Sequence, residues 1–269
     1  MSQFEQEINN AADLIGLSYR HAFLLDNEGD IVKDAERAMG YLKVYRQTPH
    51  ERPGQVKKTD RFRLVDLTPM FPGEWRDWVD VPMMSRQYDE LWVYDQDYKP
   101  SGCKLDEYLH HFCRDLKPDG WAIGISPMAC FEGPGVDKVL ARGEQLDLEC
   151  NEERLDRVVE ELEKRVGAVE TSGFVTKSSS NGHHFHGHAF HLARPEGFVK
   201  IARFIGSALL LNREGEEKAY DERSGGHQLR SLAEDHWTPS QLDSEVGCLR
   251  VTSSLLKPTQ PEFVTFTPY

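Results

Sequence analysis

The chain has few cysteines, and no two of them form a CxxC pair. The five cysteines among 269 residues are scattered and odd in number. A thiolate zinc site is therefore not expected, and a reducing cytosol is the expected compartment. No apolar run approaches the roughly 20 residues that a membrane-spanning helix needs. The first ten residues lack a basic region followed by an apolar one, so no signal peptide is expected. These absences predict a cytoplasmic protein with no membrane partner.

Basic residues are also in deficit. The chain has 32 lysines and arginines against 45 acidic residues, a net charge of -13. This balance argues against generic, charge-driven binding of nucleic acid, but a local basic site for nucleic acid stays compatible with it. The GxxxxGK[ST] phosphate loop is missing, which excludes the common class of nucleotide hydrolases. No feature of the sequence sets the oligomeric state.

The richest pattern in the chain lies between residues 88 and 125. An apolar strand over 91–94 is followed by a helix over 105–116, whose apolar residues form one stripe, and by a strand over 121–125. Strand, helix and strand in this order are typical of a parallel sheet, in which ligands bind beyond the carboxyl ends of strands. The acidic and aromatic residues at such an end are Asp95, Asp97 and Tyr98.

Periodicity predicts further elements along the chain. Helices are expected over 1–20, 32–45, 151–166 and 198–211, the third capped by Asn151. Strands are expected over 22–25, 61–67, 168–177, 187–193, 248–256 and 262–266. The strands over 168–177 and 187–193 form an expected antiparallel pair. The segment 131–143 is predicted to be an irregular link.

Four segments of the chain resemble class I S-adenosylmethionine-dependent methyltransferases. They are VPMMSRQYDELWVYD, LDEYLHHFCRDLKPDGWAIGI, the helix over 152–166, and GAVETSGFVTKS with GHAFHLARP. The resemblance covers about residues 61–195. It implies a Rossmann-like, three-layer α/β sandwich whose mainly parallel sheet closes in an antiparallel hairpin. The implied core spans 61–200, after an N-terminal segment (1–60) that can join the core and before a C-terminal extension (201–269).

The resemblance implies transfer of a methyl group from S-adenosylmethionine to an acceptor nitrogen, with a nucleic-acid base as one candidate acceptor. Asp95 would accept a hydrogen bond from the acceptor amine, and Tyr98 would pack on the acceptor. Asp97 is a further candidate catalytic residue. This chain lacks the two prolines that amino-group methyltransferases of DNA carry between the acid and the aromatic residue, so a small-molecule or protein acceptor stays open.

The resemblance also implies a cofactor site in the first half of the chain. Asp26 and Asp66 would contact the cofactor, and Gly29 would permit close approach of the backbone. The loop Leu25–Asp30 keeps one glycine of the glycine-rich turn that the family carries. A methyltransferase-like scaffold without catalytic activity is therefore an alternative.

A histidine-rich segment over 183–191 is the other unusual feature. Side chains repeat every two residues along a strand, so His184, His186 and His188 would share one face. Imidazoles placed in this way could bind a transition metal. The alternative interpretation is a solvated hairpin rim of stacked rings without a metal.

A rival hypothesis uses some of the same residues. Archaeo-eukaryotic primase-polymerases have an acid-x-acid pair, a small-x-His motif and a later acid, which resemble Asp95 and Asp97, His183, and Asp221. The segment VGCLRVTSSLLKP also resembles a terminal segment of that family. The resemblance implies a metal-dependent nucleotidyl transferase in which carboxylates hold Mg²⁺ or Mn²⁺ and the histidine contacts a nucleotide phosphate.

Overall fold

The fold is known from a computed structural model of the chain. It describes residues 10, 11, 14, 18, 21–25, 31–33, 38–46, 62–66, 121–133, 136–179, 181–192, 194–214, 218–233, 248–253 and 257–267. The strand predicted over 91–94 and the helix predicted over 105–116 lie outside these residues. The limits predicted at residues 60 and 200 stay a prediction.

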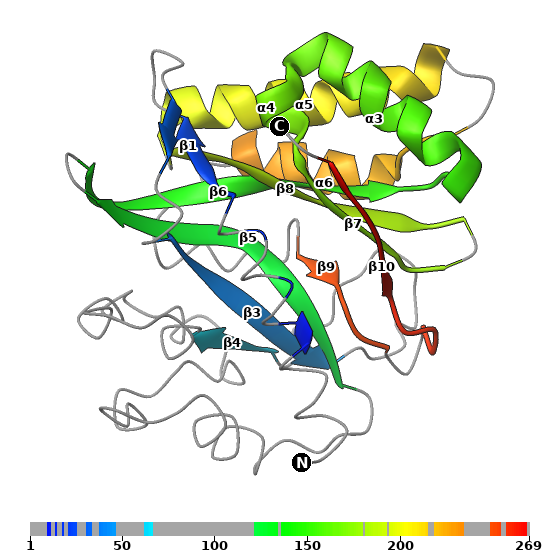
Figure 1. The fold of residues 1–269 in the computed structure, drawn as a ribbon, viewed down its shortest axis with the longest axis horizontal. Helices are drawn as coiled ribbons and strands as arrows, with labels where there is room; N and C mark the ends of the chain where they lie inside the picture. The colour runs from blue at the N-terminus through cyan, green and yellow to red at the C-terminus, as the bar shows by residue number, and fades with distance from the viewer. Residues whose placement is uncertain are drawn as a thin grey trace.

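The described strands form one curled sheet with helices against one face (Figure 1). The order along the main path is β10-β7-β8-β6-β5-β3-β4, with β1 beside β8, β2 beside β1, and β9 beside β5. The strands are β1 (Phe23–Leu25), β2 (Ile31–Lys33), β3 (Ala38–Arg46), β4 (Phe62–Asp66), β5 (Trp121–Gly133), β6 (Val136–Leu148), β7 (Gly173–Lys177), β8 (His183–Leu192), β9 (Leu249–Arg250) and β10 (Glu262–Thr267).

Mixed α/β content is confirmed, but the strand directions differ from the expected ones. Among the described pairs, β1 and β8 run parallel, and every other pair is antiparallel. The expectation of a mainly parallel sheet is therefore wrong for these strands. The antiparallel hairpin of β7 and β8 is confirmed, although β7 is preceded by a short helix, α4 (Ala168–Thr171), over residues predicted as strand.

Two local predictions are wrong because long-range pairing decides the local conformation. Of residues 32–45, predicted as a helix, the described ones (32–33 and 38–45) belong to β2 and β3, and β3 pairs with β4 on one side and β5 on the other. Residues 131–143, predicted as an irregular link, belong largely to the two long strands β5 and β6, which pair with each other. Helical periodicity does not prevail where a strand gains partners on both edges.

The helices that cover one face follow local signals. Helix α3 (Glu152–Val166) begins after Asn151, whose side chain accepts a hydrogen bond from the backbone of Arg154, so the predicted cap is confirmed. Helix α5 (Pro195–Glu214) contains the helix predicted over 198–211, whereas α6 (Glu222–Ala233) was not predicted. No helix in the described part of the chain is long and apolar enough to span a bilayer.

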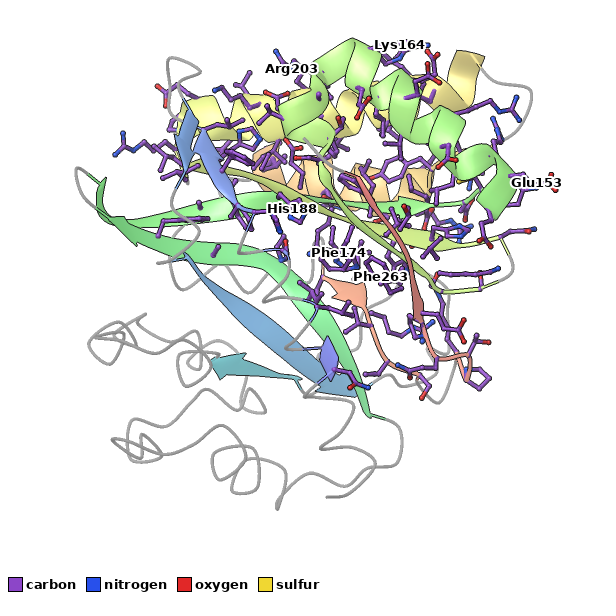
Figure 2. All side chains as sticks on the ribbon, in the orientation of Figure 1. Glu153, Lys164, Phe174, His188, Arg203 and Phe263 are labelled. Carbon is purple, nitrogen blue, oxygen red and sulfur yellow. The ribbon has the colours of Figure 1, made fainter. Side chains whose placement is uncertain are left out.

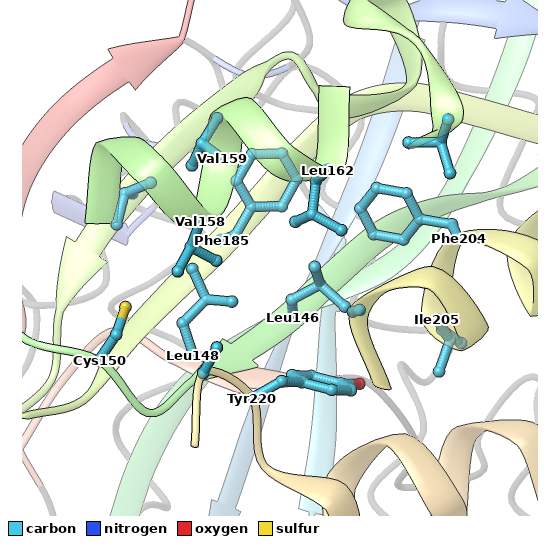
Figure 3. Packing of buried hydrophobic residues seen from close by; sticks show 14 of the residues in the cluster. Leu146, Leu148, Cys150, Val158, Val159, Leu162, Phe185, Phe204, Ile205 and Tyr220 are labelled. Atoms are coloured by element: carbon cyan, nitrogen blue, oxygen red, sulfur yellow. The ribbon is translucent and has the colours of Figure 1, made fainter. Parts of the chain in front are cut away.

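The main core lies between these helices and the sheet (Figure 3). Leu146 and Leu148 on β6 and Phe185 on β8 pack with Leu162 of α3 and Phe204 of α5. Each of these side chains is almost completely buried. Because side chains alternate along a strand, the neighbours of these apolar residues point to the opposite face of the sheet. That face carries the polar residues of the candidate site.

Candidate functional site

The structure describes three of the predicted site residues. Asp66 is the last residue of β4 and pairs with Tyr41 of β3. His183 is the first residue of β8, and Asp221 immediately precedes α6. The predicted site residues that lie outside the described part are Asp26, Gly29, Asp95, Asp97 and Tyr98.

Strand β8 carries histidines on both faces, and the two sets differ in their surroundings. Phe185 faces the helices, so His183 and His191 point to the helix side as well. His184, His186 and His188 point to the opposite side, which we call the histidine face. Figure 2 places His188 and Phe174 on the side of β8 and β7 away from the helices. The prediction that these three histidines share a face follows from the observed strand.

The register of three neighbouring strands sets two short rows of side chains on the histidine face. In the first row, His186 of β8 pairs with Gln145 of β6 and with Phe174 of β7. In the second row, His184 pairs with Asp147 and with Thr176 of the same two strands. Directly paired side chains lie about 4.5–5.5 Å apart at Cβ, so each row can act on one small chemical group.

The second row holds a histidine with a fixed tautomer. His184 Nδ1 lies 2.7 Å from the backbone oxygen of Arg250. A carbonyl oxygen only accepts, so Nδ1 carries the hydrogen and donates it. Burial lowers the pKa of His184 to about 3, so the ring is neutral at pH 7 and Nε2 keeps its lone pair.

The lone pair of His184 is close to a carboxylate. Nε2 lies 3.7 Å from Oδ1 of Asp147, which is too long for a hydrogen bond but close enough for an ion pair once the ring is protonated. Burial raises the pKa of Asp147 to about 6, with nearby Asp221 and Glu149 adding to the effect and Lys257 opposing it. At pH 7, Asp147 is therefore charged and His184 is not.

The histidine named by the primase hypothesis points to the other side. His183 Nδ1 donates to the backbone oxygen of Cys150, 2.8 Å away, on the helix side of the sheet. His184, one residue later, points to the histidine face, whereas His183, to which the hypothesis gave the phosphate contact, does not. Asp221 lies beside Asp147, because its backbone N–H donates to the Asp147 carbonyl, and its carboxylate accepts from the backbone of Arg223.

Both rows of the histidine face contain polar atoms that lack a complement. His186 stacks on Phe174 with ring centroids 4.6 Å apart and an interplanar angle of 14°. Both ring nitrogens of His186, the side-chain oxygen of Gln145 and the hydroxyl of Thr176 are buried without a hydrogen-bond partner among the described residues. Leaving such a group unsatisfied costs about 1–3 kcal/mol. These buried polar atoms make the histidine face the candidate site.

Arg250 supports the site rather than lining it. Its guanidinium donates to the backbone oxygens of Thr252, Thr259 at 2.8 Å, Lys257 at 3.4 Å and Ser178 at 3.2 Å. These bonds join β9, the end of β7 and the segment before β10. The position of the Arg250 carbonyl, which orients His184, is fixed as a result.

A metal site is incomplete in the described part of the chain. Asp147 and His184 come together, but among the described residues no group of three or more histidine, cysteine, aspartate or glutamate side chains could hold a metal ion. His188 Nδ1 lies 3.2 Å from the hydroxyl of Ser18, and His184 Nδ1 is occupied by Arg250. The described geometry thus does not support the three-histidine metal hypothesis. A solvated rim is also excluded, because all three rings are buried.

Comparisons with protein-family models, with curated proteins and with solved structures find no match for this chain. Gln145, Asp147 and Thr176 were not predicted as site residues. Their alternation with apolar residues in EQLDL and FVT is a strand signal, but it does not show that they face the histidines. The function must therefore be argued from the geometry of the histidine face.

Proposed function

We propose that the chain is a metal-dependent nucleotidyl transferase of the primase-polymerase type, with the histidine face as its nucleotide site. The observation that carries this proposal is the set of His184, the Arg250 carbonyl and Asp147 on an antiparallel sheet. The primase hypothesis requires a histidine on a strand near acidic residues, and His184 meets this requirement better than His183. Asp95 and Asp97 remain the expected ligands of Mg²⁺ or Mn²⁺.

His184 would contact a nucleotide phosphate in its protonated form. The lone pair on Nε2 can take up a proton as the phosphate binds, and Nε2–H then donates to a phosphate oxygen. Asp147 stabilises the resulting imidazolium, as a carboxylate does for a charged histidine. Lys257 is exposed, and it lowers the pKa of both Asp147 and His184. Its ammonium is a second candidate contact for the phosphate.

In the proposed reaction, a 3′-hydroxyl oxygen forms a bond to the α-phosphorus of the nucleotide and the bond between the α- and β-phosphates breaks. Pyrophosphate leaves, and the hydroxyl proton passes to a base. Divalent ions, when bound, would neutralise charge on the phosphates and activate the hydroxyl. The described residues form only part of such a metal site.

Methyl transfer from S-adenosylmethionine is the weaker candidate. It requires a crevice at the carboxyl ends of parallel strands, whereas β5, the strand predicted next to the acceptor site, has antiparallel partners in the described part. Of the cofactor residues that the resemblance implies, Asp66 lies in β4, and Asp26 and Gly29 are outside the described residues. The hypothesis stays a prediction, to be tested beside the first.

Primer extension by the full chain with Mn²⁺, a primed template and nucleotides tests the proposal. His184→Ala should lose extension by about a hundredfold or more, whereas His183→Ala should keep it. The two residues make a matched pair, because each is buried and each donates Nδ1–H to a backbone carbonyl. Circular dichroism establishes that both variants are folded.

Three results would contradict the proposal. Equal loss in both variants at equal folded fraction would assign His184 a structural role. Calorimetric binding of S-adenosylmethionine without binding of nucleotide would favour methyl transfer. Folded protein that binds neither would favour the non-catalytic scaffold.

A further inference from the structure

Gln145 and His186 of the first row and Thr176 of the second row carry polar atoms with defined donor and acceptor capacity. The Nε2 group of Gln145 donates to the backbone oxygen of Ile125 at 3.3 Å, and its Oε1 atom, an acceptor, is buried without a hydrogen-bond partner among the described residues. His186 is neutral because burial lowers its pKa, so one ring nitrogen donates and the other accepts. The hydroxyl of Thr176 can do both.

This set fits one kind of group better than others. A phosphate offers acceptors only, so it would face the lone pairs of Gln145 and of one His186 nitrogen without a hydrogen bond. An apolar group would leave all of these atoms unsatisfied. A hydroxyl group both donates and accepts, and a pair of neighbouring hydroxyls can meet two acceptors and one donor together.

We propose that Gln145, His186 and Thr176 bind the hydroxyl groups of the nucleotide sugar and thereby make the site selective for ribonucleotides. This inference rests on the proposed function, because it places the sugar beside the phosphate contact at His184, with which Thr176 pairs directly. His184 and His186 belong to adjacent rows, and their ring centroids lie 6.3 Å apart. Such a spacing suits the phosphate and the sugar of a single nucleotide.

Phe174 gives the site its rigidity. Its ring stacks on His186 and lies 6.5 Å from the ring of Phe263, so the imidazole is held in one orientation. A phenyl ring at position 186 could keep this stacking. His186→Phe therefore removes the hydrogen-bonding atoms while it preserves the shape and packing of the row.

The test measures binding of ATP, dATP and CTP, each with Mn²⁺, to the full chain by calorimetry, together with thermal unfolding without ligand. The natural chain should bind ATP about five- to tenfold more tightly than dATP. In His186→Phe the ratio should fall to about one, and the melting temperature should rise, because buried atoms without a partner are removed.

Two buried threonines provide a matched control. Thr176→Val should reduce the preference for ATP over dATP without loss of stability. Thr171→Val should leave the preference unchanged but lower the melting temperature, because Thr171 donates to the backbone oxygens of Gly167 at 2.9 Å and Ala168 at 3.2 Å on the helix side.

The outcomes separate the two proposals. If the folded natural chain binds neither ATP nor dATP, the proposed function fails and the sugar site fails with it. If both nucleotides bind but their ratio is the same in His186→Phe, the sugar site alone is overturned. If His186→Phe changes the ratio of ATP affinity to CTP affinity but leaves the ratio of ATP affinity to dATP affinity constant, the sugar site is overturned. His186 would then contact the edge of the base. A fall in the melting temperature of His186→Phe would also overturn the sugar site. It would show that the polar atoms of His186 stabilise the fold.

Discussion

The Nδ1 atom of His184 lies 2.7 Å from the backbone oxygen of Arg250, a residue 66 positions later in the chain. This bond joins a strand of the central hairpin to β9 and fixes which ring nitrogen faces Asp147. The chemistry of the histidine face is thus set jointly by two distant segments.

Nucleotide binding should be accompanied by uptake of a proton. The pKa of His184 is lowered to about 3 by burial, so the ring is neutral in the free protein at pH 7.5. Contact with a phosphate favours the imidazolium, beside the carboxylate of Asp147. Calorimetry with Mn²⁺ and ATP in two buffers of different ionisation enthalpy measures the uptake. Equal apparent enthalpies in the two buffers would contradict this role of His184.

Asp147→Asn should weaken nucleotide binding by about tenfold, which corresponds to about 1.4 kcal/mol, and should reduce the proton uptake. The asparagine keeps the size of the side chain but cannot stabilise an imidazolium by charge. The same calorimetric titration checks this. Glu149→Gln is the control, because Glu149 is exposed and its carboxylate lies 2.7 Å from Lys218. Equal weakening in both variants would indicate a general effect of negative charge.

The protein should lose stability in acid below pH 6.5. Five buried histidines have a lowered pKa, with burial as the first cause: His183, His184, His186, His188 and His191. A lowered folded pKa means that the stabilisation is fully present above the unfolded value and is lost as the pH falls towards the folded value. Each such ring changes the free energy of unfolding by up to about 1.4 kcal/mol per pH unit.

Two acids oppose this trend. Burial raises the pKa of Glu144 and of Asp147, so their contribution is largest at low pH and is lost as the pH rises through the folded value. The histidines outnumber them, so the net slope should favour neutral pH. Urea unfolding at pH 7.5 and pH 5.5 measures the difference, and His186→Phe should reduce it. Equal stability at both pH values would show that the rings are not buried in a neutral form.

Arg250→Lys should destabilise the protein by about 2–4 kcal/mol, because a lysine cannot replace the fork of donors that binds four backbone oxygens. Arg203→Lys is the control. Arg203 pairs with Glu170 at 2.6 Å, but its side chain is 56% exposed, so the expected loss is at most about 1 kcal/mol. Urea unfolding compares the two. Similar losses would mean that Arg250 does not hold the segments together.

Asn151→Ala should lower the free energy of unfolding by about 1 kcal/mol, because the first turn of α3 loses the hydrogen bond from the Arg154 backbone to the Asn151 side chain. Asn151→Asp should restore most of the stability, since aspartate accepts the same bond and favours the helix dipole. Thermal unfolding of both variants measures this. An unchanged free energy of unfolding in Asn151→Ala would show that the cap does not contribute to stability.

The parts of the fold with local signals could be predicted from the sequence. Helix α3 has its cap, its apolar stripe and its charges within 16 residues, and the hairpin of β7 and β8 has a polar turn between two β-rich runs. Strand β3 could not be predicted in this way, because its conformation depends on β4 and on β5, which lies far along the chain. Local periodicity contains no information about such partners.

The candidate site was predictable only in part. The histidine cluster and the motif around His183 both lie on or next to β8, the strand that carries the candidate site. A shift of one residue reverses the face of the sheet, and the motif alone does not decide between His183 and His184. Gln145 and Asp147 required the register of β6 against β8, which follows from packing on the helix side.

One edge of β8 is divided between two strands of very different origin. On one side, β6 accompanies β8 along almost its whole length; on the other, β7 pairs with residues 183–187 and β1 pairs with residues 189–191. During synthesis, Phe23–Leu25 is made long before β8, so β1 can pair with β8 only after most of the chain has been synthesised. Closure of so large a loop makes its docking an inherently slow, non-local event. A chain that folds without β1 in position would expose unpaired backbone donors and acceptors along residues 189–191 of β8. Such an exposed edge can pair with a strand of a second molecule.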